Sequence, residues 1–144
     1  MHVRLAEPIA SSQRFVAPAL AARVNAYAAG SDEPLMLRAL ELAVPIRVSV
    51  AGPAGPDGGT RVQIGAERNA SLFPVFDGII RAEPVDPLNA RIVMDGDYTV
   101  PLGLLGAAAD RTVLADVARA SLQQFLERMK DEVSMDVLRR DTAP

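Results

Sequence analysis

The amino-acid sequence predicts an α+β fold in which a curved antiparallel sheet grips a long C-terminal helix, with two shorter helices near the N-terminus. Three changes in hydrophobic spacing carry this prediction. Apolar residues recur every three or four positions up to residue 45, alternate with polar residues between residues 46 and 100, and return to helical spacing after residue 110. A helix that follows several antiparallel strands usually covers them, and the two together enclose an apolar interior.

The length and composition are those of one globular domain. The 144 residues are enough for a single core, and we expect residues 1–140 to form one domain and residues 141–144 a short tail. Hydrophobic residues make up 49% of the chain, which argues against disorder. Aromatic residues make up only 4% and there is no Trp, so we expect a core built mainly from Ala, Val, Leu and Ile.

Charge and residue usage exclude several classes of function. The net charge is −3 and the 15 basic residues are scattered, which gives no electrostatic case for a nucleic-acid partner or an anionic membrane. The absence of Cys excludes disulfides, thiolate metal sites and a Cys nucleophile. The sequence contains neither a secretory signal nor an apolar run long enough to span a membrane, so we expect a cytoplasmic protein without metal or cofactor.

The N-terminal segment predicts a short strand followed by a helix. Residues 3–9 form the candidate strand, although a proline interrupts it. Ser11 or Ser12 is placed to cap the helix, and the Ala-Ala-Gly sequence of residues 28–30 ends it. Pro18 predicts a kink or a late helix start. The expected apolar stripe consists of Phe15, Val16, Ala19, Leu20, Val24 and Tyr27.

A second helix is expected between residues 31 and 45. The sequence Ser-Asp-Glu-Pro at residues 31–34 combines a capping side chain with a proline in the first turn, which is typical of a helix start. Leu37, Leu40 and Val44 supply its apolar face, and Pro45 ends it.

Alternation with a period of two begins at Ile46 and predicts four antiparallel strands. The expected strands are residues 46–50, 61–67, 73–83 and 90–100, joined by turns at residues 51–59, 68–72 and 84–87.

Two Asp-Gly pairs allow a second interpretation of the longer strands. Asp77-Gly78 and Asp95-Gly96 could each form a tight hairpin turn and divide a long strand into two short ones. Alternatively, each glycine lies within a strand as a bulge or bend of a curved sheet. The pattern favours the bend, because the sequence PVDPLN at residues 84–89 already supplies a turn between the two strands.

The last helix is expected from Asp110, its N-cap, to Leu138. It would be about 40 Å long, which is enough to cross a small domain. The loop before it, with Pro101, Gly103 and Gly106, lets the last strand and the helix approach closely. The stripe of this helix is Leu114, Ala118, Leu122, Phe125, Met129 and Val133, with Val113, Val117, Leu126 and Val137 alongside.

Several segments resemble one known superfamily. They are FPVFDGI at residues 73–79, GDYTVPLG at residues 96–103, Gly106, Asp110 and ARASLQQFL at residues 118–126. These segments and the element order resemble the START-like, helix-grip superfamily, also called SRPBCC, and in particular its uncharacterised actinobacterial members. The resemblance covers residues 45–129, and the N-terminal third fits only by element order. The family's sheet usually has more strands than the four or five expected here.

The resemblance implies a hydrophobic cavity between the long helix and the concave face of the sheet. A small hydrophobic or amphipathic molecule, such as a lipid, is the implied partner. The alternative interpretation of each inward-facing residue is plain core packing. The candidate ligand-binding residues are Ile64, Phe76, Ile80, Met94, Tyr98, Leu122, Phe125 and Met129.

Among these residues only Tyr98 carries a polar group, which in a cavity would donate to a ligand carbonyl or orient water. His2 is the single histidine and lies at the chain end, so we expect no Ser-His-acid triad. Asp77 and Asp95 are explained by turn or bulge roles, and Asp97 is expected to face solvent.

Arginines are expected mainly on the solvated face of the sheet. Arg47, Arg61, Arg81 and Arg91 alternate with the apolar positions of their strands, and Arg23 lies near the stripe of the first helix, where it could bind an anionic head group.

The superfamily includes enzymes, carriers and scaffolds, so the fold leaves the function open. We expect a binding protein rather than an enzyme, with no catalytic residue. Two alternatives remain, which are a cyclase- or dehydratase-like enzyme in the same cavity, and a structural domain, possibly a homodimer, without an open cavity.

Overall fold

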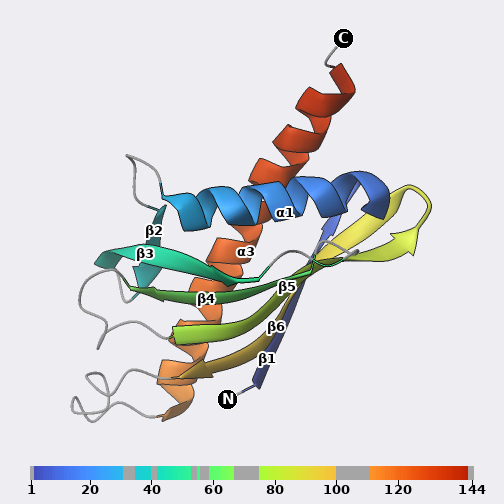
Figure 1. Ribbon diagram of the computed structural model, residues 1–144. Coiled ribbons are helices and arrows are strands. Elements are labelled where there is room, and N and C mark those ends of the chain that lie inside the picture. Colours follow the sequence, from blue (N-terminus) through green and yellow to red (C-terminus); the bar gives the residue numbers. More distant parts are fainter. Residues whose placement is uncertain are drawn as a thin grey trace.

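The computed structural model describes residues 2–30, 35–39, 42–52, 55, 59–66, 75–99 and 111–142, which form six strands and two helices (Figure 1). In chain order these are β1 (His2–Ile9), α1 (Gln13–Ala29), β2 (Leu35–Ala39), β3 (Leu42–Ala51), β4 (Thr60–Ala66), β5 (Val75–Asp86), β6 (Asn89–Thr99) and α3 (Arg111–Thr142).

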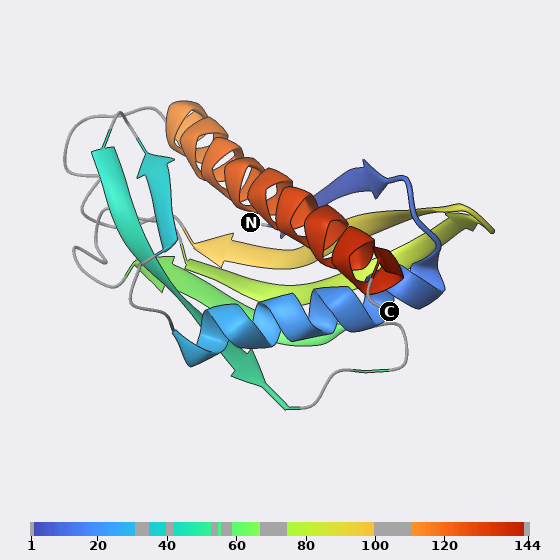
Figure 2. The same cartoon turned by 90° about the horizontal axis from the view of Figure 1, so that it is seen from above.

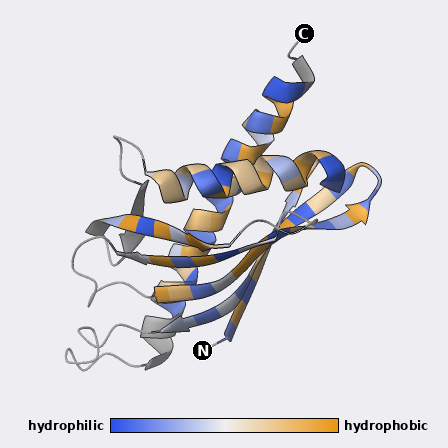
Figure 3. Ribbon diagram, in the orientation of Figure 1, coloured by the Kyte–Doolittle hydropathy of each residue, from blue (hydrophilic) through white to orange (hydrophobic). Residues whose placement is uncertain are grey.

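All six strands belong to one antiparallel sheet with the order β1-β6-β5-β4-β3-β2. The first strand therefore lies beside the last, and the long helix follows directly in the chain. Seen from above, α3 runs obliquely past α1, and the sheet curves beneath them (Figure 2). Apolar and polar residues alternate along the strands (Figure 3). The inward-facing residues of the sheet share a single core cluster with buried residues of both helices.

The predicted second helix is wrong, because its residues form a β-hairpin. Strands β2 and β3 pair antiparallel from Leu35 opposite Ile46 to Ala39 opposite Leu42. The helical spacing of the apolar residues was a local signal, and pairing with the following strand overrides it. Pro45 lies within β3 opposite Met36, one residue before the pairing of β3 with β4 begins at Ile46. The proposed helix start at residues 31–34 lies outside the described residues.

Helix α1 agrees with the prediction except at one position. Ser12 is the N-cap, and its carbonyl accepts from the amides of Phe15 and Val16 at 3.0 Å, although its side chain makes no capping bond. The helix starts at Gln13 and continues through Pro18, so proline does not delay it. Phe15 was assigned to the apolar stripe but is 41% exposed. The buried residues of this helix are Val16, Ala17, Ala19, Leu20 and Val24.

The four predicted strands from residue 46 onwards are confirmed, with one turn displaced. Strand β5 continues to Asp86, and the reversal is centred on Pro87 and Leu88 rather than on residues 84–87. The Asp86 carboxylate accepts from the Leu88 amide at 2.8 Å and from the Asn89 side chain at 2.9 Å. These bonds, the Leu88 amide first, lower the pKa of Asp86. This aspartate-led turn explains why the strand extends past Pro84.

The two Asp-Gly pairs lie within strands, which confirms the predicted bend. Gly78 and Gly96 are register partners on β5 and β6. A Cβ atom on Gly78 would lie 2.3 Å from the Asp95 carbonyl oxygen, and one on Gly96 would lie 2.4 Å from the Asp77 carbonyl oxygen. The backbones approach more closely here than any side chain permits, so only glycine fits at either position.

Helix α3 confirms the predicted long helix and extends it to Thr142, so residues 141 and 142 are helical instead of belonging to a tail. The predicted N-cap Asp110 and the side chains of Val113, Leu114 and Val117 lie outside the described residues. The C-terminal end of α3 projects past the sheet and past α1 (Figure 1). The buried residues on this helix are Ala118, Ser121, Leu122, Phe125, Leu126, Met129, Val133 and Val137.

The glycine pair gives a first prediction. Gly78→Ala and Gly96→Ala should each lower the free energy of unfolding by about 2 kcal/mol or more, because the strands must separate to admit a methyl group. Urea denaturation followed by circular dichroism measures the loss. Gly65→Ala on β4 is the control, since its Cβ would meet only Val75 Cγ2 at 3.8 Å. Equal stability of all three variants would show that the close approach is not required.

The buried side of α3 gives a second prediction. Leu122 has no exposed surface, so Leu122→Asp places an unpaired charge in the core and should lower the free energy of unfolding by more than about 4 kcal/mol. Leu138 lies on the same helix and is 59% exposed, so Leu138→Asp should remain close to wild type. Thermal unfolding of both variants checks the assignment, and a fully stable Leu122→Asp protein would mean that the buried face is wrong.

Candidate functional site

Five of the eight predicted site residues come from the inner face of the sheet, where they lie in two rows. Ile64, Phe76 and Tyr98 are register partners across β4, β5 and β6. Ile80 and Met94 pair in the same way, four residues after Phe76 on β5 and four residues before Tyr98 on β6. All five are at most 5% exposed.

Between these two rows lies a row that carries almost no side-chain volume at its centre. It contains the Gly78–Gly96 pair, with Val62 opposite Gly78 and Val3 opposite Gly96. The Phe76 ring extends over Gly78, since its Cζ atom would lie 2.8 Å from a Cβ on that residue. The glycines therefore give room for the aromatic ring on the inner face.

The remaining three predicted residues come from α3. Leu122, Phe125 and Met129 are each at most 1% exposed and belong to the same core cluster as the five sheet residues. The structure thus brings all eight predicted residues together. Burial alone does not separate a ligand-contacting role from core packing, because in this fold the two share one face.

Three polar side chains also lie in this interior, and two of them had not been predicted. Thr60 is fully buried opposite Ile80, at the end of the row formed by Ile80 and Met94. Ser121 on α3 is 1% exposed, and Tyr98 is 5% exposed. Each has an interaction partner, and no buried side-chain nitrogen or oxygen in the described part of the chain lacks one. The only sequence signal for Ser121 was its place beside Leu122 in the apolar stripe.

A polar contact fastens α1 to α3 at the edge of the core, and we call it the α1–α3 clasp. Its residues are Arg23 and Tyr27 of α1 and Glu132 and Asp136 of α3. Arg23 donates to both carboxylate oxygens of Asp136, from Nη2 at 2.6 and 2.7 Å and from Nε at 2.9 Å. The Tyr27 hydroxyl donates to Glu132 Oε2, and the Tyr27 ring lies 5.9 Å from that of Phe125.

The clasp shifts the pKa values of its α1 residues. The hydrogen bond that Arg23 donates to Asp136 raises the pKa of Arg23, which keeps the guanidinium charged. Burial, and then the hydrogen bond to Glu132, raise the pKa of Tyr27, so the phenol stays protonated. Arg23 was predicted as a possible anion ligand, but its Nε and Nη2 donors bind Asp136.

The strand arginines and Asp97 lie on the outer face of the sheet, as predicted, and Asp77 and Asp95, which were expected in turns or bulges, lie there too. Arg61 is 64% exposed and lies 3.6 Å from Asp77, while Asp97 is 77% exposed. Val93, although fully buried, lies outside the core cluster and pairs with Arg81 on this face. The stems of charged side chains therefore cover apolar surface here.

A second set of outer-face ion pairs surrounds Glu83 and Asp95. Arg4 and Arg81 reach Glu83 at 3.0 and 2.9 Å, and Arg91 lies 3.9 Å from it. His2 is 66% exposed at the chain end and lies 2.8 Å from Asp95. These charges are paired with one another on the side of the sheet away from the apolar interior. These residues therefore have structural roles in ion pairs, whereas the sequence pattern predicted only turn or solvent-facing roles for them.

Within the described part of the chain, no group of three or more His, Cys, Asp or Glu residues is arranged to hold a metal ion. Neither of the two described helices is apolar enough over a sufficient length to cross a membrane.

Comparison with known proteins identifies the fold. A conserved protein from Geobacillus kaustophilus superposes with a TM-score of 0.62 at 13% identity, covering 94% of this chain and 96% of the other. The ZhuI aromatase/cyclase from Streptomyces sp. R1128 superposes with a TM-score of 0.61 at 15% identity, covering 99% and 96% of the two chains. No protein-family model and no curated protein matches the sequence.

The element order, the inner face and these structural matches define the class. The chain has the START-like, helix-grip fold of the SRPBCC superfamily. At the identities observed, the matches establish the fold and not a shared activity.

The clasp gives a prediction about alkaline stability. Because the pKa of Tyr27 is raised in the folded state, the unfolded chain loses the phenol proton first, above a pH of about 10. The free energy of unfolding contributed by this group is therefore complete below that pH and decreases as the pH rises. Tyr27→Phe should show a shallower loss of stability than wild type between pH 9 and 11, measured by urea denaturation. Parallel pH profiles for the two proteins would contradict the assignment.

Proposed function

We propose that the protein binds or carries a small hydrophobic or amphipathic ligand between the inner face of the sheet and α3. The observation that carries the proposal is the pair of apolar rows on either side of Gly78 and Gly96, faced by buried residues of α3. The proposed ligand-contacting residues are Ile64, Phe76, Ile80, Met94, Tyr98, Leu122, Phe125 and Met129.

Apolar burial would supply the affinity and Tyr98 the orientation. Removing about 300 Å² of apolar ligand surface from water is worth about 7 kcal/mol before the cost of association is subtracted. A phenol at the end of an apolar row can donate one hydrogen bond to a ligand carbonyl. Thr60 and Ser121 are the other buried polar groups near this surface.

A cyclase- or dehydratase-like enzyme in the same place is the second candidate. It is supported by the buried Tyr98, Thr60 and Ser121 and by the structural match named an aromatase/cyclase. General acid–base chemistry, however, needs a convergent pair of groups with suitable pKa values. No Asp, Glu, His or Lys accompanies these hydroxyls among the buried side chains of the described residues, which favours binding over catalysis. A structural or dimerising domain without an open cavity is the third alternative.

Native mass spectrometry of the freshly purified protein, combined with a fluorescence titration, tests the proposal. The sequence has no Trp, so Phe125→Trp introduces a single fluorophore in the buried face of α3. We expect a co-purified small molecule in the native spectrum, or a saturable change in fluorescence with fatty acids, sterols or aromatic polycycles. Phe15→Trp is the matched control, since Phe15 is 41% exposed and lies at the start of α1.

The outcomes separate the three candidates. Saturation in Phe125→Trp but not in Phe15→Trp supports ligand binding, whereas an empty protein that responds to no probe removes the main support for it. Turnover of a bound polyketide-like probe that is lost in Tyr98→Phe would favour the enzyme. A native mass of two chains with no probe binding would favour the dimerising domain.

A further inference from the structure

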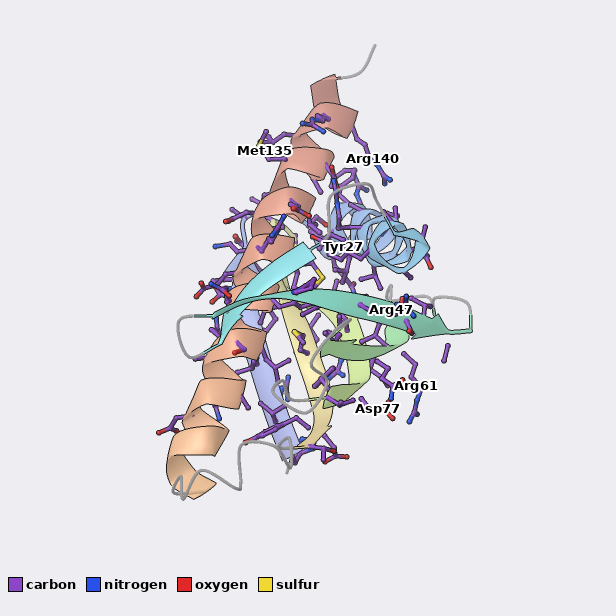
Figure 4. The ribbon with its side chains drawn as sticks, turned by 90° about the vertical axis from the view of Figure 1, so that its left-hand side faces the viewer. Tyr27, Arg47, Arg61, Asp77, Met135 and Arg140 are labelled. Carbon is purple, nitrogen blue, oxygen red and sulfur yellow. The ribbon has the colours of Figure 1, made fainter. Side chains whose placement is uncertain are left out.

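A groove separate from the apolar interior lies between the C-terminal half of α1 and the last turns of α3. It encloses about 380 Å³ and is lined by Ala22, Arg23, Ala26, Asp136, Arg139 and Arg140. Figure 4 shows Arg140 on the side of α3 that faces α1, with Met135 on the opposite side. On the α1 side the groove is lined by Arg23 and by two small residues, Ala22 and Ala26.

The groove carries an excess of positive charge in a chain whose net charge is −3. Three arginines and one aspartate line the groove, so the net charge of its lining is +2. The carboxylate of this aspartate is already hydrogen-bonded, because both oxygens of Asp136 accept from Arg23. Helix α1 contributes no acidic side chain anywhere along its length. Arg140 is exposed and makes no ion pair with another described residue, whereas Arg139 already has an interaction within the protein.

Basic residues in the last turn of a helix commonly stabilise it by interacting with the helix dipole. That role explains why α3 ends in arginines, but it does not require them to line a groove beside a third arginine on another helix. The bidentate bond to Asp136 fixes Arg23 in place, so the positive wall is partly preorganised. Guanidinium groups present planar pairs of donors that match the oxygens of a phosphate.

We propose that this groove binds a phosphate group, carried either by a soluble molecule or by a lipid head group. Arg139 and Arg140 recognise the phosphate oxygens, and Arg23 contributes a positive charge beside them. The proposal does not depend on the apolar ligand proposed above, because it uses none of those eight residues.

Titration of the full chain with inorganic phosphate, followed by amide chemical shifts at low ionic strength, tests the site. We expect saturable shifts centred on Ala22, Ala26 and the last turns of α3, and weakening as NaCl is added. The double variant Arg139→Gln/Arg140→Gln should bind phosphate at least about tenfold more weakly. The matched control is the double variant Arg119→Gln/Arg61→Gln, which loses the same amount of charge. Arg119 lies on an exposed part of α3 about 30 Å along the helix from the groove, and Arg61 lies on the outer face of the sheet.

Binding that is lost in the groove variant and kept in the control supports the site. Equal weakening in both proteins, or no saturable shift in the wild type, overturns it. Co-sedimentation with vesicles of phosphatidylglycerol in phosphatidylcholine identifies the source. If the groove variant loses vesicle binding and the control keeps it, the ligand is a lipid head group. If phosphate binds at the groove but vesicles do not, the ligand is a soluble phosphate compound.

Discussion

Leu122, Phe125, Met129 and Val133 lie along one side of α3 and have at most 1% of their surface exposed. That burial needs a partner surface that curves, because a flat sheet would cover only part of a helix of 32 residues. The sheet curves beneath α1 and α3 (Figure 2). At the Gly78–Gly96 pair, β5 and β6 approach too closely for any side chain, which leaves room between the two apolar rows of the inner face.

The two faces of the sheet use their side chains in different ways. The inner face and the two helices form one core cluster, whereas the outer face is held by ion pairs such as those of Arg4 and Arg81 with Glu83. Exposed ion pairs contribute little stability each, so the outer face does not compete with the inner one as a source of folding energy. The alternation of the strands assigns each residue to one of these faces and thus separates the charged outer surface from the apolar interior.

Much of the fold follows from hydrophobic spacing, and the failures have specific causes. Alternation from Ile46 and the long stripe from Ala118 to Val137 predict the later strands and α3, because both patterns extend over many residues. The hairpin of β2 and β3 could not be predicted, because Leu37, Leu40 and Val44 have helical spacing and the pairing that overrides it is not local. The burial of the eight candidate residues on the inner faces was predictable from their spacing, whereas the α1–α3 clasp joins residues more than 100 positions apart.

The chemistry of the interior depends on which polar groups have donors or acceptors to spare. Tyr98, Thr60 and Ser121 are buried beside the apolar rows, but each already has a partner. A ligand that competes for one of these hydroxyls must replace a bond that the protein already makes, so polar contacts add orientation more than affinity. Catalysis would in addition need a general acid or base of suitable pKa beside these groups. The free energy available in this interior is therefore mainly that of apolar burial, which suits the retention of a hydrophobic molecule better than its conversion.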